Sequence, residues 1–290
     1  MSAPATVAAA PAAATAPGRR RRPPLPVLLA IAVLAVAAIC ALLGTAIAPH
    51  GADAQDLAAG VRGPGGSHLL GTDDSGRDIL SRVIAGARMA VVGPALIVLG
   101  AALIGTVLGL VAGYVGGWRD TLIMRVADAV YALPSLVVVI VLVGVVGGGY
   151  AAAVAILILF IGPFDARLVR GVTLEQRGLP YVDAARTLGL SRRRIMFRHV
   201  WPNVLPVVVA NSFLNFAYAL VALSALSFLG IGVDPGEADW GRMLSDNLSL
   251  IEDNPMAPLA PGIALVLLAV AMNLVGDWLY EQLSDRGRAR

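Results

Sequence analysis

The chain has 290 residues, of which 58% are hydrophobic and only 14% are charged, and its mean hydropathy is +0.78. Soluble domains carry about 25% charged residues, so this composition excludes an ordinary soluble protein and indicates an integral membrane protein. The single cysteine, Cys40, lies in an apolar run, which excludes a disulfide framework and a cysteine-based metal site.

The N-terminal region predicts a tail followed by a membrane anchor. Residues 1–24 are rich in alanine and proline and contain four consecutive arginines, which is typical of a disordered segment. The apolar run 25–48 is long enough to cross a ~30 Å hydrocarbon core as the first transmembrane helix. The alternative is a cleaved signal peptide, since Ala46-Ile47-Ala48 resembles a cleavage site. The run exceeds a signal h-region of roughly 7–15 residues, which favours an anchor.

A polar loop and five further apolar runs follow. The loop covers residues 49–88 and is expected to contain an amphipathic helix from Gly76 to Met89. The further runs cover residues 89–115, 127–147, 150–164, 204–229 and 258–280. Together the runs predict an all-α integral membrane protein with six transmembrane helices, a transmembrane domain over 89–280 and a tail over 281–290. Prolines inside the runs, such as Pro134, are tolerated where neighbouring helices satisfy the freed backbone groups.

The arginines predict the orientation of the chain. All 22 basic residues are arginine, and 17 of them fall on one side if the N-terminus is placed inside. These are four at 19–22, two at 119 and 125, eight between 165 and 203, and three at 286, 288 and 290. Because cytoplasmic segments carry the excess of arginine, both termini are expected in the cytoplasm of a multi-pass protein of the cell membrane. The basic pI of about 9.4 therefore reflects sidedness and predicts no nucleic-acid partner.

The basic segment 181–203 is expected to fold as two short helices. Pro180 stands near a first-turn position, Gly189 is placed as a helix stop, and Ser191 can cap a second helix. Ala184 and Ala185 would give the first helix a smooth face. From the residues alone, two interpretations stay open: a rigid element docked on a cytosolic partner, or a basic loop held near anionic lipid headgroups.

This segment resembles the EAA loop of ABC importer permeases. The family pattern begins with Glu-Ala-Ala, which is followed after three residues by Gly. After nine further residues come an apolar residue, any residue, Leu and Pro. In this chain Asp stands for Glu, His for the apolar residue and Trp for Leu. The resemblance implies a coupling loop over 165–203 that contacts the ATPase subunit, with these residues as its core: Asp183, Ala184, Ala185, Gly189, His199 and Pro202.

Other stretches extend the resemblance from about residue 69 to the end of the chain. They are "LGTDDSGRDILSRVIAGARMAV", "GWRDTLIMRVADAVYALPSL", "ALSFLGIGVDP" and "MNLVGDWLYEQLSDR". They are similar to the C-type, or second, permease subunit of dipeptide, oligopeptide and nickel importers. The resemblance implies the type I importer fold, a second homologous permease, two cytosolic ATP-binding subunits, an extracytoplasmic substrate-binding protein, and no cofactor.

The function implied by this resemblance is ATP-driven import of short peptides. Nickel or another small solute is an alternative substrate, and a self-contained secondary transporter is an alternative of another class. Because the chain has no lysine, it has no P-loop motif, so it is not expected to be an enzyme and ATP hydrolysis would reside in partner subunits.

The charged patch Asp73, Arg77 and Asp78 lies in the polar loop. It could contact a substrate-binding protein or gate the outer mouth, but turn and helix-cap chemistry favours a structural role. The acids do not match the spacing of an EF-hand, so no metal is expected there.

Two acids and three histidines remain outside these motifs. Asp128 follows Arg125 by three residues, which predicts a pair on one helix face, and Asp277 is expected to cap a helix or face water. The three histidines are far apart in sequence and on both sides of the membrane, which makes a three-histidine zinc site implausible; they are His50, His68 and His199.

Overall fold

A computed structural model describes residues 23–58, 60–147 and 149–288, with only the backbone over 283–288. Most of the predicted N-terminal tail lies outside these residues. Within them the chain folds into helices, turns and two isolated β-bridges, with no strand, which confirms the all-α prediction.

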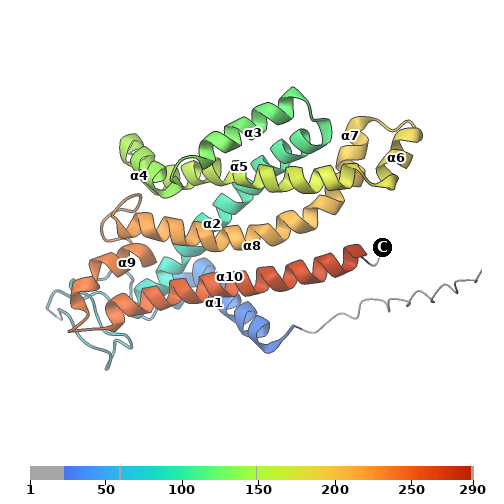
Figure 1. Cartoon of the computed structure of the whole chain (residues 1–290). Coiled ribbons are helices and arrows are strands. Elements are labelled where there is room, and N and C mark those ends of the chain that lie inside the picture. The colour runs from blue at the N-terminus through green and yellow to red at the C-terminus, as the bar shows by residue number, and fades with distance from the viewer. Residues whose placement is uncertain (1–22, 59, 148, 289–290) are drawn as a thin grey trace, which may run out of the picture.

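Five helical segments of the described chain are long and apolar enough to cross a membrane (Figure 1). They are α1 (Leu25–Ile47), α2 (Ile79–Leu110) with the π-turn η1 (Val111–Val115), α5 (Gly149–Arg177), α8 (Trp201–Phe228) with the turns before it, and α10 (Met256–Arg288). A sixth span exists if α3 (Trp118–Tyr131) and α4 (Ser135–Val146), which meet at a bend of 86°, count as one.

The bend corrects the predicted continuous span 127–147. Pro134 precedes α4 with an extended backbone (ψ 103°), and α3 closes as Ala132 N donates to Asp128 O at 3.0 Å. Proline lacks an N–H and disfavours the α conformation in the residue before it, so Leu133 cannot continue the helix. Pro134 therefore divides the span in two.

Two further helices differ from their predicted bounds. The expected amphipathic helix 76–89 begins at Ile79, capped by Asp78, and runs without a break to Leu110 as part of α2. The expected loop 165–203 is shorter, because α5 continues to Arg177. The helix continues beyond its apolar run, and two arginines in this part, Arg167 and Arg170, each form an ion pair with an acid of α3.

Helices α2 and α5 cross with their backbones close together. Three glycines repeat every four residues and face α5, Gly105 and Gly109 on α2 and Gly113 in η1. A Cβ atom would lie 2.3 Å from Asp165 Cβ at the first position and 2.6 Å from Ala166 O at the second. Small residues at this spacing allow membrane helices to approach closely, and here only glycine fits.

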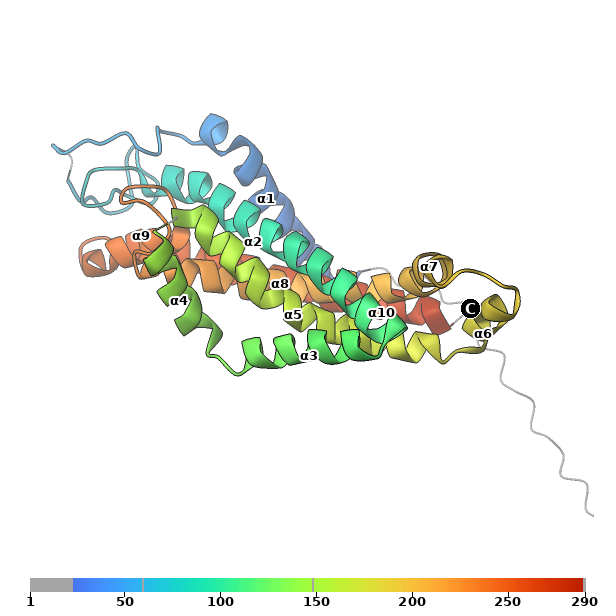
Figure 2. The same cartoon turned by 90° about the horizontal axis from the view of Figure 1, so that it is seen from above.

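The polar segments gather at two opposite ends of the bundle (Figures 1 and 2). One end holds the loop between α1 and α2, together with α9 (Trp240–Asp246). Asn254, in the segment between α9 and α10, connects that segment to the loop by donating to the carbonyls of Leu70 and Thr72. The other end holds α6 (Pro180–Thr187), α7 (Arg192–Ile195) and the C-terminal end of α10.

Candidate functional site

The short helices α6 and α7 form a hairpin, residues 180–195, as their local signals predicted. Pro180 opens α6 in its first turn, and Gly189 follows it in the left-handed conformation (φ 73°). Gly189 N donates to Arg186 O at 2.9 Å and Leu190 N to Ala185 O at 3.2 Å, which is the Schellman arrangement. Ser191 caps α7 by accepting from Arg194 N, so the predicted cap is confirmed.

The two faces of α6 have different environments. Val182 and Ala185 are buried in an apolar cluster that also contains residues of α5, α7 and α8. Ala184 is exposed on the opposite face, and Leu188 at the end of the helix is 80% exposed. The sequence analysis placed Ala184 and Ala185 on one smooth face, but successive residues of a helix point about 100° apart. Only Ala184 is therefore available to another protein.

Hydrogen bonds join the hairpin to α5 and α8. The Tyr181 hydroxyl donates to Gln176 Oε1 at 2.8 Å, near the end of α5, and accepts from Asn203 Nδ2 at 3.4 Å, in the first turn of α8. Asn203 Nδ2 also donates to His199 O at 2.7 Å. The hairpin is thus attached to both helices by polar contacts as well as by its buried face.

The remaining residues of the EAA resemblance lie close to these contacts. Asp183 is exposed and paired with Arg186 at 2.9 Å. His199 is half-buried in the π-helical turn η2 (Met196–Val200), and Pro202 is exposed at the start of α8. Pro202 cannot donate a backbone hydrogen bond, which accounts for the irregular turn before it.

A cavity of about 450 Å³ lies between the bend of α3 and α4 and the middle of α5 and α8. Its wall is mostly apolar, and the Ser135 hydroxyl and Tyr218 hydroxyl lie 3.0 Å apart across it. The volume falls within the range of small-molecule sites. The lining residues are Val130, Tyr131, Leu133, Ser135, Leu157, Phe160, Ile161, Phe164, Asn211, Leu214, Asn215 and Tyr218.

A buried acid supports the polar side of this cavity. Asp165 is 4% exposed, and its Oδ1 accepts hydrogen bonds of 2.8 Å from Asn211 and from Asn215. Ionisable groups at membrane depth are functional candidates. Asp165 was not predicted as a site residue, because it lies one residue beyond the predicted span 150–164. Two asparagines four residues apart within the apolar run 204–229 were the available signal.

Asp128 pairs differently from the prediction. Its carboxylate accepts from Arg167 of α5, whereas the sequence analysis expected Arg125 on the same helix. The Arg167 guanidinium lies 4.6 Å from the ring centroid of Tyr131, beside the cavity. An interhelical pair beside an aromatic ring gains a cation–π contact that an exposed pair on one helix lacks. Asp277 is exposed on α10.

The charged patch of the polar loop is buried, which supports the structural interpretation. Asp73 accepts from Arg77 Nε at 2.7 Å, and Asp78 caps α2 by accepting from Ser81 N at 2.8 Å. Burial raises the pKa of Asp78, but hydrogen bonds from Ser81 and His68 outweigh it and hold the pKa below its usual range. Arg82 donates to the carbonyls of the segment before α9, so the patch connects the two loops at this end.

Comparison with known proteins identifies the family. Residues 105–288 match the family described as binding-protein-dependent transport system inner membrane component. The chain is 38% identical over 224 residues to the glutathione transport system permease protein GsiD of Pectobacterium atrosepticum, covering 77% of this chain and 74% of the relative. It is 36% identical over 226 residues to the dipeptide transport system permease protein DppC of Alkalihalophilus pseudofirmus (78% and 74% covered). It is 35% identical over 241 residues to the probable D,D-dipeptide transport system permease protein DdpC of Escherichia coli (83% and 80% covered). The chain belongs to the family of inner membrane components of binding-protein-dependent transport systems.

Proposed function

We propose that this chain is a permease subunit of an ATP-driven importer for short peptides. The relatives named for glutathione, dipeptides and D,D-dipeptides support this substrate class. The assembly would contain a second homologous permease, two cytosolic ATP-binding subunits and an extracytoplasmic binding protein. In the same proposal both termini are cytoplasmic, and residues 89–280 form the transmembrane domain with residues 25–48 as a preceding helix and 49–88 as an extracytoplasmic loop.

The hairpin 180–195 is the proposed contact with an ATP-binding subunit. Its exposed tip carries Ala184 and Leu188, and an exposed apolar side chain beside a charged rim is typical of a docking surface. Asp183 and Arg186 form that rim. The hairpin lies at the same end of the bundle as the C-terminal end of α10 (Figure 1), the end that the arginine distribution predicts to be cytoplasmic.

The observation that carries the proposal is the connection between the hairpin and the cavity. Tyr181 is bonded to Gln176 of α5 and to Asn203 of α8, and the same two helices line the cavity through Phe164 and Asn215. Movement of the hairpin by an ATP-binding subunit would therefore move the parts of the cavity wall that α5 and α8 form. Apolar side chains of the hairpin, α5 and α8 belong to one buried cluster, and close packing in this cluster makes the connection rigid.

The cavity offers the chemistry that a short peptide needs. Asn211 and Asn215 present amide groups beside the buried carboxylate of Asp165, and most of the remaining lining is apolar. A peptide has amide groups, two charged ends and side chains that are often apolar. We propose that this wall forms half of the path and that the second permease supplies the other half.

The test is peptide uptake by the reconstituted assembly in proteoliposomes. Ala184→Trp should lower ATP-dependent uptake of a labelled dipeptide at least tenfold and weaken binding of the ATP-binding subunits, because the indole occupies the docking face. Ala184→Ser adds only a hydroxyl and is the matched control, with uptake near wild type. Wild-type uptake by Ala184→Trp at equal membrane levels would refute the proposed contact.

The wild-type assembly tests the substrate class and the energy source. Uptake of nickel but not of peptides would show that the assembly is an ATP-driven importer with a different substrate. Peptide uptake by this chain alone, driven by an ion gradient without ATP-binding subunits, would replace the proposal with a secondary transporter.

A further inference from the structure

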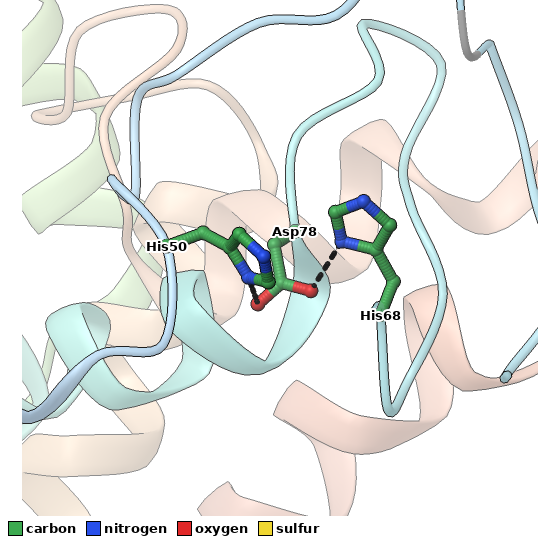
Figure 3. Close-up of side chains that lie close together, drawn as sticks. All are labelled: His50, His68 and Asp78. Atoms are coloured by element: carbon green, nitrogen blue, oxygen red, sulfur yellow. Dashed lines mark hydrogen bonds and ion pairs between the residues drawn. The ribbon is translucent and has the colours of Figure 1, made fainter. Parts of the chain in front are cut away.

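The loop between α1 and α2 brings two histidines and an aspartate together (Figure 3). His50 follows the end of α1, His68 closes the turn that begins at Gly65, and Asp78 caps α2. One ligand atom from each lies within 4.8 Å of the other two. The cluster was not predicted from sequence, because its three residues are separated by 18 and 10 positions and match no metal-binding motif.

The positions of the three side chains are close to those of metal ligands. His68 Nδ1 lies 2.9 Å from Asp78 Oδ1, and His50 Nδ1 lies 3.7 Å from Asp78 Oδ2. Zinc bonds of ~2.0–2.1 Å in a tetrahedron place neighbouring ligand atoms roughly 3.3 Å apart. One observed distance is shorter than that value and the other is longer, and they run to different oxygens of Asp78, so both imidazole rings would shift when the ion binds.

A buried nitrogen without a hydrogen-bond partner supports a metal site at this cluster. The Nδ1 atom of His50 is buried and has no hydrogen-bond partner, and it points toward Asp78 (Figure 3). A buried polar atom without a hydrogen-bond partner destabilises the folded state, because its desolvation is not compensated. A cation between the two histidines and the carboxylate would bond to this atom, whose contact with Asp78 Oδ2 at 3.7 Å is too long for a hydrogen bond.

The surroundings hold Asp78 in place for this role. Its Oδ2 accepts from Ser81 N at 2.8 Å and from Ser81 Oγ at 2.6 Å, while Oδ1 faces His68. His50 N in turn donates to Ser81 Oγ at 3.0 Å, which fixes the backbone beside the ligand atom. Hydrogen bonds of this kind orient metal ligands.

We propose that His50, His68 and Asp78 bind a Zn²⁺ ion that anchors the loop to the start of α2. Two imidazole nitrogens and one carboxylate oxygen suit zinc, whereas calcium and magnesium prefer oxygen ligands. The side chain of His50 is 37% exposed, which leaves a side open for entry and for a water as fourth ligand. His68 would bind as the tautomer protonated at Nε2, giving up the hydrogen bond from Nδ1 to Asp78.

The test measures zinc binding to the full-length chain in detergent, after removal of metals with a chelator. Equilibrium dialysis with ZnCl₂ and elemental analysis should give one zinc per chain, and X-ray absorption should show two imidazole ligands. His50→Ala and His68→Ala should each weaken binding at least tenfold. His199→Ala should bind like wild type, because His199 lies in η2, in the part of the chain next to the hairpin.

Folding is checked by size exclusion and by thermal unfolding without metal. Added zinc should raise the unfolding temperature of wild type and of His199→Ala, but not of the double variant His50→Ala/His68→Ala. Asp78 is left unchanged because it also caps α2. Equal zinc retention by wild type and a folded double variant, or no retention by either, would overturn the proposal without affecting the proposed transport function.

Discussion

Gly109→Ala tests the close crossing of α2 and α5. A Cβ atom at this position would lie 2.6 Å from Ala166 O and 2.6 Å from Val169 Cβ, where ordinary contacts begin at 3.4 Å. The helices would have to separate by about 0.8 Å, the difference between these values. Overpacking of this kind costs about 1–3 kcal/mol, and a backbone oxygen cannot rotate away, which favours the upper part of the range.

Two effects of opposite sign therefore compete. Alanine stabilises a helix by up to ~1 kcal/mol relative to glycine, so the net loss should be about 1–2 kcal/mol. Thermal unfolding in detergent should then occur about 2–8 °C below wild type. Gly144→Ala in α4 is the matched control, because nothing lies within 4 Å of its added Cβ, and it should unfold at or above wild type. An unfolding temperature of Gly109→Ala equal to that of wild type would refute the argument.

Two further predictions concern the hairpin and the loop before α9. Tyr181→Phe removes the bonds to Gln176 and Asn203, so the assembly should hydrolyse severalfold more ATP per peptide transported, with little change in thermal stability. An unchanged ratio would show that these bonds do not contribute to coupling. Burial raises the pKa of Asp239 despite hydrogen bonds from Arg242, so the folded state binds a proton more readily than the unfolded state. Its stabilisation is present at low pH and is lost as pH rises through the folded pKa. The unfolding temperature of Asp239→Asn relative to wild type should therefore increase from pH 4 to pH 8, and the opposite trend would contradict this reasoning.

The hairpin could be predicted from sequence because its determinants are local. Pro180 sets the first turn, Gly189 supplies the left-handed residue and Ser191 caps the next helix, each within a few residues of the bond it affects. The bounds of α1, Leu25–Ile47, agree with the predicted run 25–48 to within one residue for the same reason. Signals that act within one turn of the backbone are readable without knowledge of the tertiary structure.

The errors concern contacts that depend on the other helices. Pro134 is compatible with a kink or with a break, and only the packing of α3 and α4 on α5 decides between them. Arg125 was a reasonable partner for Asp128 by spacing, but Arg167, distant in sequence, reaches that carboxylate. The burial of Ala185 also depends on distant parts of the chain, because the apolar cluster to which it belongs includes Val169 of α5 and Val204 of α8. Pairings between distant residues have no local signature in a single sequence.

Helix α5 connects the cavity to the hairpin, and its stiffness should determine whether the two act together. Phe164 at the cavity and Gln176 at the hairpin are twelve residues apart, which is about 18 Å along a helix. A tilt of about 10° over this length displaces one end by roughly 3 Å relative to the other. Such a displacement would change the shape of the cavity only if the intervening turns do not bend.

Gly171 allows this stiffness to be changed without a side-chain clash, because nothing lies within 4 Å of a Cβ atom added there. Gly171→Pro removes a backbone hydrogen bond and kinks the helix, at a cost of about 3 kcal/mol. It should abolish peptide uptake while the ATP-binding subunits still co-purify with the chain, since the tip with Ala184 is unchanged. Gly171→Ala strengthens the helix and should transport at least as well as wild type. Uptake by Gly171→Pro at the wild-type rate would show that the hairpin does not act on the cavity through α5, and it would leave α8 as the only connection seen among the described residues.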